Sequence, residues 1–211
     1  MQINIDKKSG ILLAVIAILL AVIGAILIDQ RTQPQDRGRV HHNGHDDVMS
    51  MNSTQSNNAS AFQGNDIMFA QMMIPHHEQA VELSNLALLT SKNPEILALA
   101  ESIRDAQSPE IMQMKGWLTL ANAPTEMGHT MSEGMGGMLS ETELANLKKA
   151  TGNIFDKLFL TGMIAHHEGA IHMTMMIRDS ANVEVKNLGE KIVASQSSQI
   201  TQMQKMLANL K

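Results

Sequence analysis

Apolar residues follow two different patterns along the chain. From Ile11 to Ile28 they form an unbroken run, whereas from Asp66 onward they recur every three or four positions between polar residues. The second pattern is typical of amphipathic helices. Its interruptions predict four helices, over residues 66–91, 94–121, 142–180 and 183–209.

The apolar run of residues 11–28 is long enough to cross a bilayer as a helix. Lys7 and Lys8 precede it, which favours an N-terminus in the cytoplasm. A cleaved signal peptide is the alternative, but its apolar stretch is usually shorter and is followed by small residues. We expect residues 1–28 to be a membrane anchor or signal segment. The polar residues 29–65, which include His and Met, then form a flexible linker outside the cytoplasm.

An internal repeat organises the remainder of the chain. The segment MIPHHEQA, which begins at Met73, returns 90 residues later as MIAHHEGA, which begins at Met163. The repeated unit is a pair of helices, over about 66–121 and 142–211. Two such hairpins can bury their apolar stripes only against each other. The sequence therefore predicts an all-α fold, an antiparallel four-helix bundle over residues 66–211.

The composition excludes several functions. The 211 residues carry a net charge of −5 and no basic patch, so nucleic-acid binding is not expected. Cysteine is absent, which excludes disulfides, thiolate catalysis and cysteine-type zinc sites. Methionine, in contrast, occurs 18 times in a chain with only four Phe and one Trp. This excess suggests that some methionines bind a ligand.

Histidine and methionine share helix faces in both repeats. Residues four apart lie on one face, so Met73 can approach His77, and Met163 can approach His167. A thioether and an imidazole together select a soft ion such as Cu(I), or Ag(I) as its mimic, over zinc or magnesium. Methionine also fills gaps in helical cores, and paired histidines can be hydrogen-bonded core groups. The apolar surroundings favour metal binding, because an unpartnered buried imidazole is costly.

The segment between the predicted hairpins, residues 124–139, is rich in methionine and glycine. It lacks apolar periodicity, so its methionines have no predicted core to fill. It is either a flexible set of metal ligands or a loop that folds back as a cap on the bundle. Its candidate ligands are Met127, His129, Met131, Met135 and Met138.

A complete copy of the motif HHxxA, followed by an apolar residue, any residue and Met, runs from His166 to Met173. It resembles the hallmark of a bacterial family of domains of unknown function that includes the CopM-like periplasmic copper-binding proteins. This resemblance covers about residues 66–211. It implies a ferritin-like four-helix bundle, binding of Cu(I) and Ag(I) through Met and His, and a role in copper resistance. The positions that it marks are Met163, His166, His167 and Met173 in the second repeat and Met73, His76 and His77 in the first.

The first repeat departs from this motif. Leu83 replaces the methionine, and Glu82 stands where the second repeat has His172. The first site is therefore either weaker or completed by Met112 or Met114 from the next helix. The full set of candidate metal ligands is Met72, Met73, His76, His77, Met112, Met114, Met127, His129, Met131, Met135, Met138, Met163, His166, His167, His172, Met173 and Met176.

These patterns predict a protein without catalytic activity that binds Cu(I) as a buffer or metallochaperone. We expect it in the periplasm, anchored to the inner membrane, or secreted if the first segment is cleaved. Copper-transport proteins are candidate partners. One alternative is a ferritin-like oxidase of Cu(I) or iron, but the one Glu-x-x-His, Glu126 to His129, lies in the glycine-rich segment. The other alternative is a structural helical module on a membrane anchor.

Overall fold

The computed structural model describes residues 62–127 and 136–210. The chain divides into two units, Met1–Ser50 and Met51–Lys211, and all the described residues lie in the second unit. Among these residues there are helices but no strands, which confirms the predicted all-α class for this part of the chain. The elements are α2 (Gly64–Thr90), α3 (Pro94–Leu120), α4 (Glu141–Lys149), α5 (Gly152–Met173), the 3-10 turn η1 (Thr174–Ile177) and α6 (Val183–Asn209).

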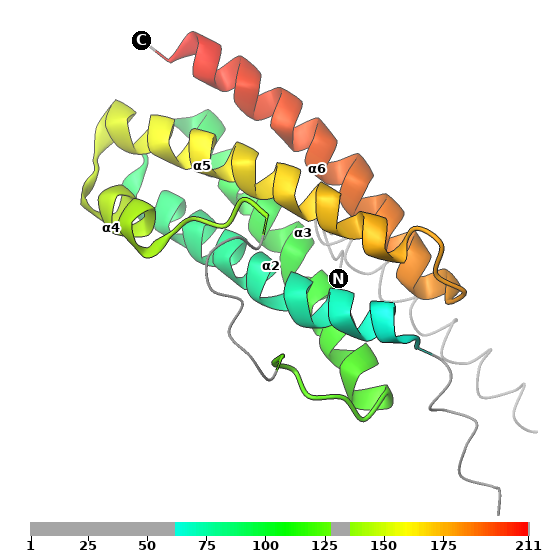
Figure 1. Ribbon diagram of the computed structural model, residues 1–211. Coiled ribbons are helices and arrows are strands. Elements are labelled where there is room, and N and C mark those ends of the chain that lie inside the picture. The colour runs from blue at the N-terminus through cyan, green and yellow to red at the C-terminus, as the bar shows by residue number, and fades with distance from the viewer. Residues whose placement is uncertain (1–61, 128–135, 211) are drawn as a thin grey trace, which may run out of the picture. The chain divides into compact units, whose positions relative to one another are not determined.

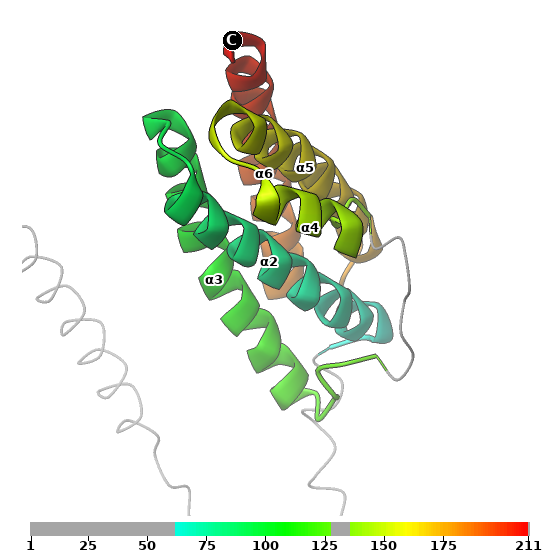
Figure 2. The ribbon, with the colours of Figure 1, turned by 90° about the vertical axis from the view of Figure 1, so that its left-hand side faces the viewer.

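The four long helices form two hairpins. Helices α2 and α3 run antiparallel and pack along their length, and α5 and α6 do the same (Figure 1). The two hairpins meet through α2 and α5, whereas α3 and α6 make little contact with each other. The short helix α4 lies against α5 (Figure 2). This arrangement places the two copies of the histidine motif on the helices that face each other.

Both hairpins turn in the same way. Asn93 caps α3 by accepting a hydrogen bond from the backbone N–H two residues later at 3.0 Å, and Asn182 caps α6 by the equivalent bond at 2.9 Å. The backbone N–H of each asparagine donates to a serine hydroxyl two residues before it, Ser91 or Ser180, at 3.1 Å. The breaks predicted between residues 91 and 94 and between residues 180 and 183 are confirmed.

The prediction of a single helix over residues 142–180 is wrong. Ala150 and Thr151 are extended, and Gly152 has a φ of +57°. Residues with a side chain rarely adopt this backbone conformation, so Gly152 permits the break between α4 and α5. A glycine signals such a break, but the apolar periodicity continues across it.

The 3-10 turn η1 lies where the two repeats fall out of step. The histidine pairs are 90 residues apart, whereas the capping asparagines Asn93 and Asn182 are 89 apart. A 3-10 helix rises about 2.0 Å per residue, against about 1.5 Å in an α-helix. The four residues of η1 are therefore longer by roughly 2 Å, which compensates for the missing residue.

The core consists of two apolar clusters. The first apolar cluster contains Phe69 and Trp117, and the second contains Phe155 and Phe159. On each long helix, the buried positions between the two clusters are polar. We call these residues the polar layer: His76, His77, Gln107, His166, His167 and Gln196.

No helix in the described ranges is long and apolar enough to span a membrane. The predicted anchor or signal segment, residues 1–28, lies outside the described residues, as does the predicted linker up to residue 61. Three predicted ligands of the glycine-rich segment, His129, Met131 and Met135, also lie outside them.

Candidate metal centre

The structure brings the two predicted histidine pairs together. His76 and His77 on α2, and His166 and His167 on α5, are all completely buried. The ring centres of His76 and His166 are 3.8 Å apart, with an angle of 41° between the ring planes. Within each pair the ring centres are further apart, at 6.5 Å for His76 and His77 and 6.3 Å for His166 and His167. The two repeats therefore meet at these two imidazoles.

Three of the four imidazoles donate a hydrogen bond through Nε2. The acceptors are Gly136 O for His76 at 3.0 Å, Glu110 Oε2 for His77 at 2.8 Å, and Gln199 Oε1 for His167 at 2.7 Å. A neutral imidazole carries one proton, so a ring that donates through Nε2 has its lone pair on Nδ1. For His76 and His77, whose acceptors are a carbonyl and a carboxylate, the hydrogen bonds thus leave Nδ1 of the neutral ring free to bind a ligand.

The free nitrogens have no partner within the described part of the chain. Nδ1 of all four histidines is buried and unpaired, and so is Nε2 of His166. Leaving one such group unsatisfied costs on the order of 1–3 kcal/mol. Four unsatisfied lone pairs in one layer are consistent with a ligand that accepts electron pairs, which is what a metal ion does. The residues present therefore fit the predicted metal.

Burial keeps the rings of His76, His166 and His167 neutral. It lowers the pKa of His76 and of His167 from 6.5 to about 4, and neighbouring histidines add to the effect in both cases. Burial also lowers the pKa of His166 well below its usual value, again with a contribution from the other histidines. At neutral pH their lone pairs are therefore not occupied by protons.

Glutamine and glutamate complete the layer, although the His and Met patterns of the sequence do not mark them. Gln107 on α3 and Gln196 on α6 are buried, and both have side-chain atoms without a partner. Glu110 and Gln199 lie one turn further along the same helices and accept hydrogen bonds from the histidines. The 89-residue spacing of both pairs is the signal that could have identified them.

The predicted methionine ligands divide into three groups. Met73 and Met163 are completely buried one helical turn before His77 and His167. Met114 and Met173 are buried in the first apolar cluster, and Met72 and Met176 pack against it from half-buried positions. Met127 and Met138 are half-buried in the inter-hairpin segment.

Met112 is not brought to the polar layer. It is 69% exposed, whereas Ile111 beside it is buried. Since successive helical residues point in different directions, Met112 faces solvent from α3. The suggestion that it completes the first site is therefore not supported, and the buried Met114 stays as the candidate from this helix.

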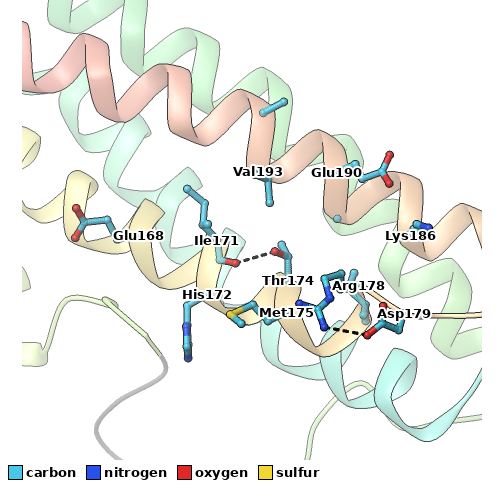
Figure 3. Close-up of a pocket in the computed structure, with 13 residues that line it drawn as sticks. Glu168, Ile171, His172, Thr174, Met175, Arg178, Asp179, Lys186, Glu190 and Val193 are labelled. Carbon is cyan, nitrogen blue, oxygen red and sulfur yellow. Dashed lines mark hydrogen bonds and ion pairs between the residues drawn. The ribbon is translucent and has the colours of Figure 1, made fainter.

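His172 also lies away from the polar layer. It is exposed and, with Met175, lines a groove of about 770 Å³ between α5, η1 and α6 (Figure 3). The groove has apolar residues such as Ile171 and Val193 among charged ones. The candidate ligand His172 is therefore separate from the buried histidines.

The end of the inter-hairpin segment packs directly on α5. A Cβ atom on Gly169 would lie 1.3 Å from the carbonyl oxygen of Gly136, and one on Gly137, whose φ is +84°, would lie 1.9 Å from Ala165 O. Only glycine permits so close a contact. This contact places the Gly136 carbonyl where it accepts from His76.

The same segment is also fastened to α2. The side-chain amide of Gln79 donates to the carbonyl of Leu139 at 3.0 Å and accepts from its backbone N–H at 2.8 Å. Residues 136–139 thus lie across α2 and α5, next to the histidines. For these residues the cap alternative of the sequence analysis is supported.

The fold and the polar layer define a class, namely duplicated helical hairpins whose histidine pairs meet inside the bundle. Residues 66–207 match the family described as "Domain of unknown function (DUF305)", and the chain belongs to this family. The family resemblance inferred from the HHxxA motif is confirmed. No curated protein is similar enough to match the chain.

Several solved structures are similar to this chain. A DUF305 protein from Streptomyces coelicolor is 33% identical with a TM-score of 0.64, and 69% of this chain aligns with 91% of that one. A DUF305 fragment from Deinococcus radiodurans is 32% identical with a TM-score of 0.66, over 70% of this chain and 98% of that one. CopM in the Cu(I)-bound form is 30% identical with a TM-score of 0.58, over 70% and 98%. CopM was also solved in Cu(II)-bound and Ag-bound forms.

Proposed function

We propose that the polar layer binds Cu(I), and Ag(I) in its place, as cargo. The main support for this proposal is the set of four buried Nδ1 atoms, on histidines from both repeats, that have no partner among the described residues. The similarity to CopM, which has been solved with copper and with silver bound, supports it. A soft monovalent ion suits the layer because neutral imidazoles and thioethers need not lose a proton in order to bind it.

The ligand set of each ion is one or two imidazoles completed by methionine. No three His, Cys, Asp or Glu side chains in the described ranges are grouped as a metal centre requires. Sulfur from Met73 and Met163 supplies the further ligands, because each lies one turn from a histidine of the layer. This mixed set favours Cu(I) over harder ions such as iron.

A titration of the protein with Cu(I) or Ag(I) against a competing chelator tests this function. We expect wild type to take the ion from the chelator, and the double variant His166→Ala/His167→Ala to take up clearly less of it. His172→Ala is the matched control, because His172 is exposed and outside the polar layer. The proposal fails if wild type does not compete, or if the double variant remains folded and competes equally well.

In the cell, the protein would buffer copper or pass it on without turnover, in the periplasm and tethered to the inner membrane. The apolar run of residues 11–28 and the absence of cysteine support this location and role. Fractionation and protease accessibility of the full chain test the location. Oxygen uptake on addition of Cu(I) or iron tests the role, since sustained uptake would indicate an oxidase.

A further inference from the structure

The polar layer has the same residue types in both repeats, but the acceptors of His77 and His167 differ. His77 and His167 occupy equivalent places in the two repeats, and each donates through Nε2 to a side chain of the neighbouring helix. The acceptor in the first repeat is the carboxylate of Glu110, and in the second it is the amide of Gln199. The hydrogen bonds are alike in length, 2.8 and 2.7 Å, so the two halves differ here in charge rather than in geometry.

The charge of Glu110 is directed at the layer. Its side chain is only 17% exposed and contacts the fully buried ring of His77. In the described residues no lysine or arginine pairs with it. Lys115, which lies on the same helix, instead pairs with Glu78 at 2.7 Å. The negative charge of Glu110 is thus available to stabilise a cation bound to the imidazole.

A carboxylate and an amide also differ in how firmly they orient the ring. An ionised carboxylate can only accept, so it holds the proton of His77 on Nε2 and leaves the lone pair on the buried Nδ1. An amide can rotate to present either its oxygen or its NH₂ group, so Gln199 permits both tautomers of His167. Outer partners of this kind typically change metal affinity by about 10–100-fold.

We infer that Glu110 is a positioning residue for the cation: it fixes the ring of His77 with Nδ1 free and supplies the negative charge that favours a bound monovalent ion. This inference rests on the proposed function of the polar layer. The inference predicts that the part of the polar layer from the first repeat binds the ion more tightly than the part from the second repeat. This holds although Leu83 replaces the methionine of the motif in the first repeat. Gln199 marks the weaker half.

The chain itself offers the matched substitutions. Glu110→Gln gives His77 an amide acceptor, like that of His167, and keeps the hydrogen bond. Gln199→Glu gives His167 a carboxylate acceptor, like that of His77. Glu78→Gln is the control. It also removes a carboxylate, next to His77 in the sequence, but this carboxylate pairs with Lys115 and not with the polar layer. In an Ag(I) titration we expect Glu110→Gln to weaken binding about 10–100-fold, Gln199→Glu to strengthen it, and Glu78→Gln to change it less than about threefold.

A second measurement does not depend on metal. The ¹⁵N shifts of the imidazoles in the metal-free protein report which nitrogen of His77 carries the proton. We expect the Nε2–H form in wild type and a mixture of both forms in Glu110→Gln, while the melting temperature changes little. A residue with a merely structural role would change the melting temperature without changing this ratio.

The outcomes separate this inference from the proposed function. If wild type binds Ag(I) and folded Glu110→Gln binds it equally well, the inference is wrong and the proposed function stands. If Glu110→Gln does not fold, Gln199→Glu decides, since misfolding cannot account for a gain in affinity and no gain overturns the inference. If wild type binds no Ag(I) at all, both are wrong.

Discussion

Each buried histidine of the polar layer depends on contacts with other elements. The ring of His76 relies on a carbonyl from the inter-hairpin segment, and the ring of His77 relies on a carboxylate from α3. His166 has no hydrogen-bond partner within the described residues, and its ring lies against that of His76. This difference makes His166 the histidine whose electron pairs are least engaged by the protein itself.

The protonation of these rings predicts an acid-sensitive fold. The folded-state pKa of His76 and of His167 is about 4, below the 6.5 of an ordinary histidine. Between these two values the unfolded chain binds more protons than the folded one, so the free energy of unfolding falls as the pH falls. We expect a loss on the order of 1–3 kcal/mol per histidine between pH 7 and pH 4.5, and little change above pH 7. Urea unfolding of the metal-free protein at several pH values measures this.

The control for this pH dependence is the double variant His76→Asn/His167→Asn, which should lose less stability over the same interval. Hydrogen bonds from Trp117 and Gln113 lower the pKa of Glu184 from its usual value, so the contribution of this carboxyl group is lost mainly below this interval. A free energy of unfolding that does not change between pH 7 and pH 4.5 would contradict the lowered histidine pKa values.

At the scale of single elements, close backbone contacts decide how the inter-hairpin segment lies on α5. We expect Gly169→Ala to destabilise the protein by about 1–3 kcal/mol, because the added Cβ would lie 1.3 Å from Gly136 O. It should also increase amide exchange over residues 136–139. Thermal unfolding and hydrogen exchange measure the two effects.

Gly116→Ala provides the matched helical control for this substitution. A Cβ atom at Gly116, within α3, meets nothing within 4 Å. We expect the change to stabilise the protein by about 0.5–1 kcal/mol, because alanine favours the helix over the unfolded chain. If the two substitutions had equal effects, the contact between Gly169 and Gly136 would not contribute to stability.

For the whole molecule, the polar layer joins all four long helices. It has histidines on α2 and α5 and glutamines on α3 and α6, and it separates the two apolar clusters. A ligand held between the facing rings of His76 and His166 would contact both hairpins, so it would stabilise their association rather than one helix. Binding and global stability are therefore coupled.

This coupling predicts that Ag(I) raises the melting temperature of the entire bundle. At a free ion concentration 100 times Kd the folded state gains about 2.7 kcal/mol. Amide exchange should slow in α2, α3, α5 and α6 together. The double variant His166→Ala/His167→Ala serves as the control and should show a smaller shift, and an equal shift there would place the binding outside the layer.

Much of the fold and part of the site could be predicted. The helices α2, α3 and α6, the two turns and the burial of the histidine pairs agree with the sequence patterns, because helical spacing alone decides which residues share a face. The break at Gly152 could not be read from apolar periodicity, which continues through it. The exclusion of Met112 and His172 from the layer depends on how each helix is rotated toward its neighbours.

By itself, then, the amino-acid sequence determined an all-helical chain with a duplicated hairpin and with His and Met on shared faces, since these properties depend on neighbours within three or four residues. Only the tertiary structure decided that His76 meets His166, and that Glu110 and Gln199 hold the other two rings. These contacts join residues on different helices. Their distances follow from packing and hydrogen bonding between elements, which no local pattern specifies.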